Sequence, residues 1–325
     1  MSKRLIVFLT LLSIIVIVGS YVSLPYYSEA PGPAREVTPL IQFTRHPRYD
    51  SQGHLVLTSV LESVQRLTAL GVVGAWLDPN RSVVPENELL FPGETQAQEQ
   101  QRSVSQMDQS KLDAVASVLK DLDGYPAKHG KGVLVESVIP GCPAEGKLFP
   151  GDLITEINGE PVHVRQEAMD AIDAVPLDEP VRFSVTAGGS SETVSVSRER
   201  CGPEHDPLVG ISTLQNFPFD VTIQSGDIAG PSAGLMWALG FYDLLTPGDL
   251  TQGRTIAGTG AIDRDGKVYR IGGVAEKLVA AQRAGAGVFL VPQQNYAEAR
   301  AANPGIRLVP VSSLQDAVDF LKGGG

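Results

Sequence analysis

An uncharged apolar segment at the N-terminus limits how this 325-residue chain can fold more than any other feature. Lys3 and Arg4 precede a run from Leu5 to Val18 that has no charged side chain. About 20 apolar residues cross the hydrocarbon core of a bilayer, so this run, continued to Leu24, is long enough. The sequence therefore predicts one transmembrane helix within residues 1–27.

The charges beside this segment predict how the chain is oriented. Two basic residues before the run and none directly after it place the N-terminus in the cytoplasm and the remainder outside, in the plasma membrane. A cleaved signal peptide shares this pattern, and Ser28-Glu29-Ala30 resembles a cleavage site. Pro31 disfavours cleavage there, and Tyr26-Tyr27 resemble interfacial anchors. We therefore favour a retained, single-pass anchor.

Composition excludes several classes of function. The formal net charge of −11, without a basic cluster beyond the N-terminus, argues against a nucleic-acid-binding surface. Five scattered histidines and two cysteines give no zinc pattern, and we expect no metal and no cofactor. Cys142 and Cys201 lie in the part expected outside the membrane, where a disulfide is permitted. Two free buried thiols remain equally open at this point.

A serine begins the most apolar helix that the sequence predicts. Residues 232–245 are apolar nearly all round, which is typical of a buried helix. Ser232 directly follows Pro231, which suits a helix start. Backbone N–H groups and the positive end of the helix dipole favour negative charge there. Ser232 is therefore a candidate nucleophile, with an oxyanion site at Ser232 and Ala233. The alternative is that Ser232 only caps the helix.

A lysine 45 residues after this serine (277 minus 232) is the candidate base. On the helix predicted for residues 274–285, Val274, Leu278 and Ala281 form an apolar side, with Lys277 on its flank. Burial lowers the pKa of a lysine, and only the neutral amine can take a proton from serine. The alternative is a lysine whose amine reaches into water. No histidine stands at an informative spacing from Ser232, so a Ser–His–Asp triad is the weaker alternative.

Three ordered blocks carry a resemblance. Residues 225–235, 255–263 and 266–277 together resemble the proteolytic domain of the Lon proteases, which the match follows over roughly residues 205–325. The resemblance implies an α/β (α+β) proteolytic fold, a hydrolytic Ser232–Lys277 pair and, as a family expectation, assembly into a homo-oligomer. It also implies that Thr259 helps to hold the lysine.

The chain departs from that family in two ways. ATP-dependent members usually carry an acidic residue three positions before the serine, where this chain has Ala229. The nearest acid, Asp227, stands two residues earlier, which puts its role in doubt. No Gly-x-x-x-x-Gly-Lys-[Ser/Thr] loop occurs in the sequence, so no phosphate-binding loop of that kind is visible. A peptidase of this kind is expected to work without ATP.

A second resemblance precedes the first in the chain. Residues 130–200 read as short strands and turns, and Gly-Asp-Leu-Ile followed by Ile-Asn-Gly resembles a PDZ domain. Such domains bind extended peptide tails by strand addition. By analogy, the carboxylate-binding loop would be Gly130, Lys131, Gly132 and Val133, with the helix 166–174 as the other wall. The alternatives are a small spacer module, or a sheet edge that the chain covers itself.

These observations predict an organisation of the whole chain. A transmembrane anchor (1–27) and an N-terminal region (28–125) precede a PDZ-like domain (126–200) and a Lon-type proteolytic domain (201–325). A strand at residues 53–60, followed by a helix over 62–70, is expected to supply opening strands of the proteolytic domain. Residues 96–109 are either a loop or the start of a helix through 112–122.

The resulting functional prediction is a membrane-anchored, ATP-independent serine endopeptidase. Its partners would be protein or peptide substrates recruited by the PDZ-like domain. Two alternatives remain open: a non-catalytic peptide-binding scaffold, and a protein that uses the Ser–Lys pair to cut its own chain.

Overall fold

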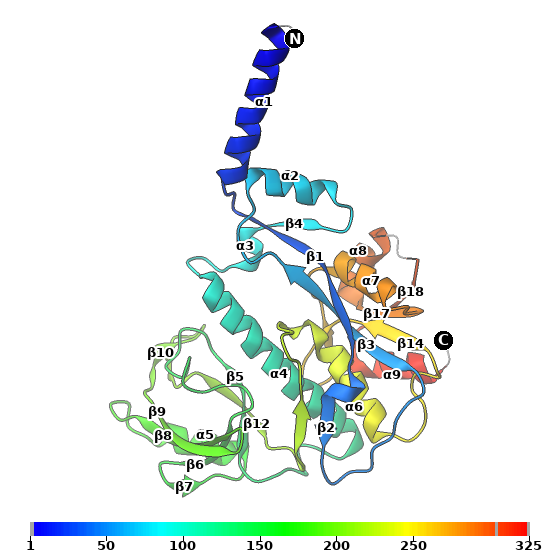
Figure 1. Cartoon of the computed structure of the whole chain (residues 1–325). Coiled ribbons are helices and arrows are strands. Elements are labelled where there is room, and N and C mark those ends of the chain that lie inside the picture. The colour runs from blue at the N-terminus through cyan, green and yellow to red at the C-terminus, as the bar shows by residue number, and fades with distance from the viewer. Residues whose placement is uncertain (1–2, 303–304, 324–325) are drawn as a thin grey trace.

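The computed structural model describes residues 3–302 and 305–323. Figure 1 shows two folded parts and a long N-terminal helix that projects from one of them. One part is built around a six-stranded sheet that mixes early and late segments of the chain. The other is a smaller β-rich domain from the middle of the chain.

Helix α1 (Lys3–Tyr21) has 19 residues and no buried side chain. At 1.5 Å per residue it is about 28 Å long, close to the thickness of a bilayer core. Within the described residues it is the one helix long and apolar enough to cross a membrane. The helix was expected to continue to Leu24, but it ends at Tyr21. The N–H of Leu24 instead donates to the carbonyl of Leu67 (2.8 Å), in the folded part of the chain. Tyr27, which was expected to be an interfacial anchor, is only 4% exposed. Its side chain packs inside the folded part and does not reach a membrane interface.

The larger sheet has the order β18-β17-β14-β3-β1-β4. Strands β3, β14, β17 and β18 run parallel, and β1 is antiparallel to both β3 and β4. Strands before and after the smaller domain therefore form one sheet. Its strands are β1 (Tyr26–Glu36), β3 (His54–Glu62), β4 (Ser82–Pro85), β14 (Thr255–Gly258), β17 (Val288–Pro292) and β18 (Arg307–Val311).

Helices cover both faces of this sheet. Leu55 and Leu57 of β3 belong to one core with helices α4, α6 and α9, whereas Val56 belongs to the core beneath α7. Successive side chains of a strand point to opposite faces, so β3 is apolar on both sides. The helices are α4 (Gln96–Leu122), α6 (Gly234–Leu245), α7 (Val274–Arg283), α8 (Tyr296–Ala301) and α9 (Leu314–Lys322).

Two predictions for the N-terminal region need comment. The helix expected over residues 62–70 is wrong: a loop follows β3, and helix α2 (Ala69–Leu77) begins later, capped by the side chain of Thr68. Residues 96–122 form one helix, so the alternative of a loop over 96–109 is wrong. Thr95 and Gln98 make a capping box that fixes the start of this helix. The shorter elements are β2 (Ile41–Phe43), α3 (Glu86–Leu89), β13 (Val221–Ile223), β15 (Ala261–Ile262), β16 (Val268–Tyr269) and the 3₁₀ turns η1 (Thr38–Leu40), η2 (Pro231–Ala233) and η3 (Gln293–Asn295).

The smaller domain is a sheet of order β12-β5-β6-β8-β9, with β7 paired to β6 and helix α5 beside it. Its edge strand β12 (Ile211–Gln215) lies beyond residue 201, where the sequence predicted the proteolytic domain to begin. That boundary falls inside the smaller domain, because β12 pairs antiparallel with β5. The elements are β5 (Val133–Val138), β6 (Leu153–Ile157), β7 (Glu160–Pro161), α5 (Arg165–Asp173), β8 (Val181–Ala187), β9 (Ser190–Val196), β10 (Glu199–Cys201) and β11 (Asp206–Leu208).

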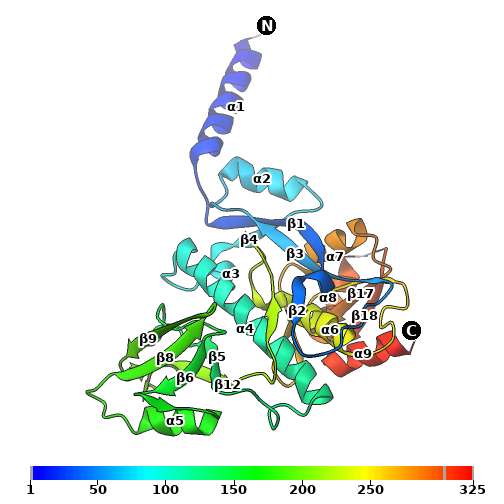
Figure 2. The same ribbon diagram turned by 60° about the horizontal axis from the view of Figure 1, so that its bottom comes forward.

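Helix α4 joins the two folded parts. Met107 and Leu119 of α4 share one core with Trp237 of α6. The same core contains Leu134 of β5 and Leu214 of β12. Figure 2 shows α4 running between the smaller sheet and α6. The two domains therefore pack on a common helix.

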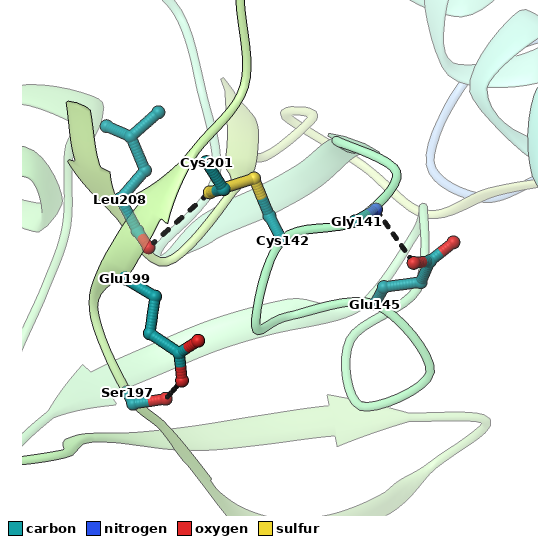
Figure 3. Close-up of a disulfide and its surroundings, with 7 residues drawn as sticks. All are labelled: Gly141, Cys142, Glu145, Ser197, Glu199, Cys201 and Leu208. Atoms are coloured by element: carbon teal, nitrogen blue, oxygen red, sulfur yellow. Dashed lines mark hydrogen bonds between the residues drawn. A yellow bond between two sulfur atoms is a disulfide. The ribbon is translucent and has the colours of Figure 1, made fainter. Parts of the chain in front are cut away.

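Cys142 and Cys201 form a disulfide, with their Cα atoms 5.4 Å apart (Figure 3). The bond joins the loop after β5 to β10, and the alternative of two free thiols is excluded. Gly210 lies against this bridge, since a Cβ there would come within 2.1 Å of Cβ of Cys142.

Candidate active site

Ser232 lies in turn η2, just before α6. Its carbonyl accepts hydrogen bonds from Thr259 Oγ1 (3.0 Å) and from the N–H of Gly260 (2.8 Å). The carbonyl of Pro231 accepts one from Ser110 Oγ of α4 (3.0 Å). Neither η2 nor α6 has a side-chain capping bond at its start. The capping alternative therefore fails, and the half-buried Ser232 is held in this turn by its backbone hydrogen bonds.

Lys277 is the fourth residue of α7 and is only 3% exposed. Gly273 precedes the helix in the left-handed region (φ 65°), and a Cβ there would lie 2.6 Å from Cγ1 of Val60. Glycine thus lets α7 begin directly against β3. Val274, Leu278 and Ala281 are buried as predicted. A lysine this deeply buried does not extend its amine into water, which excludes that alternative.

The surroundings of Lys277 favour its neutral form. Burial lowers its pKa to about 8, although the charges of Glu29 and Glu62 act in the opposite direction. Within the described residues Lys277 forms no salt bridge. With a pKa of about 8, about a tenth of the amines are neutral at pH 7. Such a lysine can accept a proton near neutral pH.

Glu29 of β1, which sequence reasoning missed, is the carboxylate whose charge acts most strongly on this lysine. Its pKa is raised to about 7 by burial first and then by the charges of Glu62 and Glu276. A Cβ at Gly273 would lie 3.2 Å from Oε2 of Glu29, which places the carboxyl beside the start of α7. Glu29 stands opposite Glu62 in the register of β1 and β3. No local pattern predicts this, because strand register joins segments far apart in the chain.

Thr259 directly follows β14 and is fully buried. Its N–H donates to the carbonyl of Leu290 (3.0 Å), and its hydroxyl donates to the carbonyl of Ser232. The resemblance implied that Thr259 helps to hold Lys277. In the structure its hydroxyl instead holds the backbone of Ser232. Asp227, whose role was in doubt, is largely exposed and pairs with Arg35 (2.6 Å).

The two candidate residues approach β3 from opposite faces of the larger sheet. Turn η2 belongs to the side covered by α4 and α6, and α7 covers the other side. Both η2 and α7 contact β3. The hydroxyl of Thr58 on β3 donates to the carbonyl of Gly258 (3.3 Å), beside Thr259. The segments that carry serine and lysine thus both pack on β3.

A second candidate site lies in the smaller domain, between α5 and the segment leading into β12. It is a cavity of about 200 Å³. Its lining residues are Ala168, Met169, Ile172, Asp173, Pro207, Leu208, Val209, Gly210, Ile211 and Thr213. We call this cavity the α5–β12 groove. Since β12 is the edge strand of its sheet, its outer edge can accept another strand.

Backbone amides are available at one end of the α5–β12 groove. The carbonyls of Val209 and Gly210 accept bonds from Ala144 (2.9 Å) and Ile139 (2.8 Å). In the part of the chain that the structure describes, neither residue donates its own N–H. Gly210 has φ 90°, a conformation that suits glycine. Two adjacent amides without partners can donate to a carboxylate.

The loop predicted for that role, Gly130 to Val133, is already occupied. The N–H of Gly130 donates to the carbonyl of Asn216 (3.0 Å), and the Asn216 side chain donates to the carbonyl of Lys131 (2.8 Å). Gly132 accepts from the N–H of Asn216, and Val133 pairs with Gln215 of β12. The assignment is corrected for a physical reason: a strand from much later in the chain covers this edge.

Comparison with known proteins agrees with the fold. Residues 212–319 match the Lon protease (S16) C-terminal proteolytic domain, and residues 134–186 match a PDZ domain. Lon protease 2 of Bacillus subtilis is 33% identical over 137 residues, 41% of this chain and 24% of that protein. Lon protease 1 of Herpetosiphon aurantiacus is 46% identical over 69 residues, 21% of this chain and 8% of that protein.

A solved structure is similar to the smaller domain. The PDZ domain of an SdrC-like protein from Listeria innocua is 34% identical, with 25% of this chain and 92% of that chain covered and a TM-score of 0.23. The chain spans less than a quarter of the length of both Lon relatives. It contains a proteolytic domain of the Lon serine peptidases joined to a PDZ domain.

Proposed function

We propose that this chain is a membrane-anchored serine endopeptidase that hydrolyses peptide bonds through Ser232 and Lys277 and needs no ATP. The observation that carries the proposal is the buried lysine. Its pKa of about 8 and its position on the sheet that also holds the Ser232 turn suit it for general-base chemistry.

The proposed reaction has two steps. Neutral Lys277 takes the proton of Ser232 Oγ as this oxygen attacks the carbonyl carbon of the peptide bond, and the lysine then gives that proton to the departing amine. In the second step, Lys277 takes a proton from water as the water attacks the acyl ester, and it returns the proton to Ser232. The amides at Ser232 and Ala233 would stabilise the oxyanion in both steps. Thr259 would act as a positioning residue through the backbone of Ser232.

Two observations support a retained anchor with the peptidase outside the cytoplasm. Cleavage after Ala30 would remove Tyr26 and its neighbours from β1, where they pair with β4 and bring Glu29 to Lys277. The Cys142–Cys201 disulfide fits an oxidising compartment. Both agree with a plasma-membrane protein whose N-terminus is cytoplasmic.

The α5–β12 groove is the proposed entry point for substrate tails. An extended C-terminal peptide would add to β12 and place its carboxylate on the amides of Val209 and Gly210. Ser212 of β12 donates to Glu136 (2.5 Å), which also accepts from Arg264 of the proteolytic domain (3.1 Å). The hydrogen bonds from Ser212 and Arg264 to Glu136 connect the peptide-binding strand to the proteolytic domain. Through them, a bound peptide would affect the peptidase.

The test uses the full chain in detergent micelles, with an unfolded protein such as casein and no ATP. Activity should be lost in Ser232→Ala and in Lys277→Ala, with unchanged circular dichroism. Lys267→Ala, which removes an exposed lysine ten positions earlier in the chain (277 minus 267), is the matched control and should keep full activity.

Each rival predicts a different outcome. Inactivity of all forms, also with a C-terminal peptide added, would favour the non-catalytic scaffold. Self-cleavage would show as a shorter wild-type chain that stays at full length in Ser232→Ala.

A further inference from the structure

Helix α2 (Ala69–Leu77) exposes an apolar surface that the soluble part of the protein does not cover. The helix has no charged or polar side chain. Only Ala75 is buried, whereas Trp76 is 79% and Leu77 69% exposed. Leu70 (37%) and Val73 (51%) lie one turn apart on the same face as Trp76 and Leu77. A helix at a water-exposed surface normally turns polar residues outward, so this face needs another covering.

The helix begins where α1 ends. The N–H of Ala69 donates to the carbonyl of Val22 (2.9 Å), and Leu24 bonds back to Leu67. The Leu70 side chain packs close to Gly19 of α1. A Cβ atom on Gly19 would lie 3.2 Å from Cγ of Leu70. Figures 1 and 2 both show α2 running across the foot of α1. The position of α2 is therefore fixed relative to α1.

The exposed face of α2 continues the apolar surface of α1. Between them, Tyr21 and Val22 are 84% and 45% exposed. A bilayer crossed by α1 ends at the foot of that helix, and this is the depth at which α2 lies. Tryptophan is favoured in the interfacial region, and an apolar helix in the plane of the membrane buries its face there.

We propose that α2 is a membrane-contact helix whose Leu70, Val73, Trp76 and Leu77 enter the interfacial region of the bilayer that α1 spans. The proposal rests on the anchor in the proposed function. The partner is the lipid itself. With two attachments, α1 and α2, the proteolytic domain cannot rotate freely about its anchor, and β1 starts at a fixed distance from the membrane surface.

Tryptophan fluorescence tests the contact directly. The chain has two tryptophans, and Trp237 is fully buried. The full chain is placed in phosphatidylcholine vesicles with or without bromine atoms on the acyl chains, near the headgroup or near the bilayer centre. The difference in emission between wild type and Trp76→Phe reports on Trp76 alone. Bromines near the headgroup should quench the Trp76 emission, and bromines near the bilayer centre should leave it unchanged. In Val73→Asp, bromine at either depth should leave the Trp76 emission unchanged.

A carbonate wash of the same vesicles separates two ways of failing. A retained chain whose Trp76 emission ignores bromine would overturn the α2 contact and leave the anchor intact. A chain released by carbonate would overturn the anchor and this proposal with it. Disulfide crosslinking of Val73→Cys between two chains, with no quenching by bromine, would assign the surface to a second copy and would also overturn the proposal.

Discussion

The proposed proteolytic site and the α5–β12 groove differ in how far they are open to solvent. In the proposed reaction Lys277 must lose its proton, and its almost complete burial beside the core beneath α7 favours the neutral form. The groove, which we propose accepts a strand, has an open sheet edge and two amides without partners in the described residues. The proposed chemistry depends on excluding water, and the proposed recognition depends on leaving the backbone accessible.

This difference decides which variants should affect which kinetic constant. Changes at the closed site remove groups that act in the transition state and should lower kcat. Changes at the open groove remove binding that is shared by substrate and transition state, and should raise KM. Variants at the two sites test this separation.

The largest effect is expected at Lys277. Lys277→Met should lower kcat by about a thousandfold or more, because serine loses its base. The same change should raise the free energy of unfolding at pH 7 by about 1–3 kcal/mol, since a buried lysine with a lowered pKa costs stability when protonated. Casein cleavage and urea unfolding measure the two quantities. A variant that loses activity and stability together would assign Lys277 a structural role only.

The pH dependence should be nearly as large. Only neutral Lys277 can act as a base, so kcat should rise about tenfold per pH unit below its pKa of about 8 and level off above it. The free energy of unfolding should also rise with pH between about 8 and the ordinary lysine value, where only the unfolded chain binds the extra proton. A kcat that is flat from pH 6 to 9 would argue against this lysine as the base.

At the groove, Met169→Lys should raise KM about tenfold for a substrate recruited by its C-terminal tail. Met169 is 40% exposed on α5, so a lysine there fits without disturbing the core. Neither kcat nor the cleavage of a short peptide too small to reach the groove should change. Asp170→Asn, one residue away and outside the groove lining, is the matched control. Equal loss on both substrates would show that the groove acts through the fold instead.

The same division explains what the sequence could predict. The helices beside Ser232 and Lys277 follow from local patterns of apolar and small residues, and the structure has helices there, at Gly234–Leu245 and Val274–Arg283. The groove was assigned to Gly130–Val133 because a strand-edge site consists of backbone amides, which every residue has. Only the pairing of β5 with β12, some 75 residues later, decides which edge stays free. Glu29 was missed for the same reason.

Glu29 gives the smallest and sharpest test. Its charge raises the pKa of Lys277 against the effect of burial. Glu29→Gln should therefore lower that pKa and move the rise of kcat by about half a pH unit toward acid. About half of the Glu29 carboxyls are already neutral at pH 7, so kcat at that pH should increase by less than about twofold, and the full shift should appear at higher pH.

Glu62→Gln should act in the same direction with a smaller shift, and Glu276→Gln with a smaller one again, following the order of their charges' influence on Lys277. pH–rate profiles of the three variants beside wild type decide the question. A shift toward alkaline pH in Glu29→Gln would mean that this carboxyl does not act on the lysine through its charge. The closed site would then be tuned by burial alone, and its difference from the open groove would rest on desolvation.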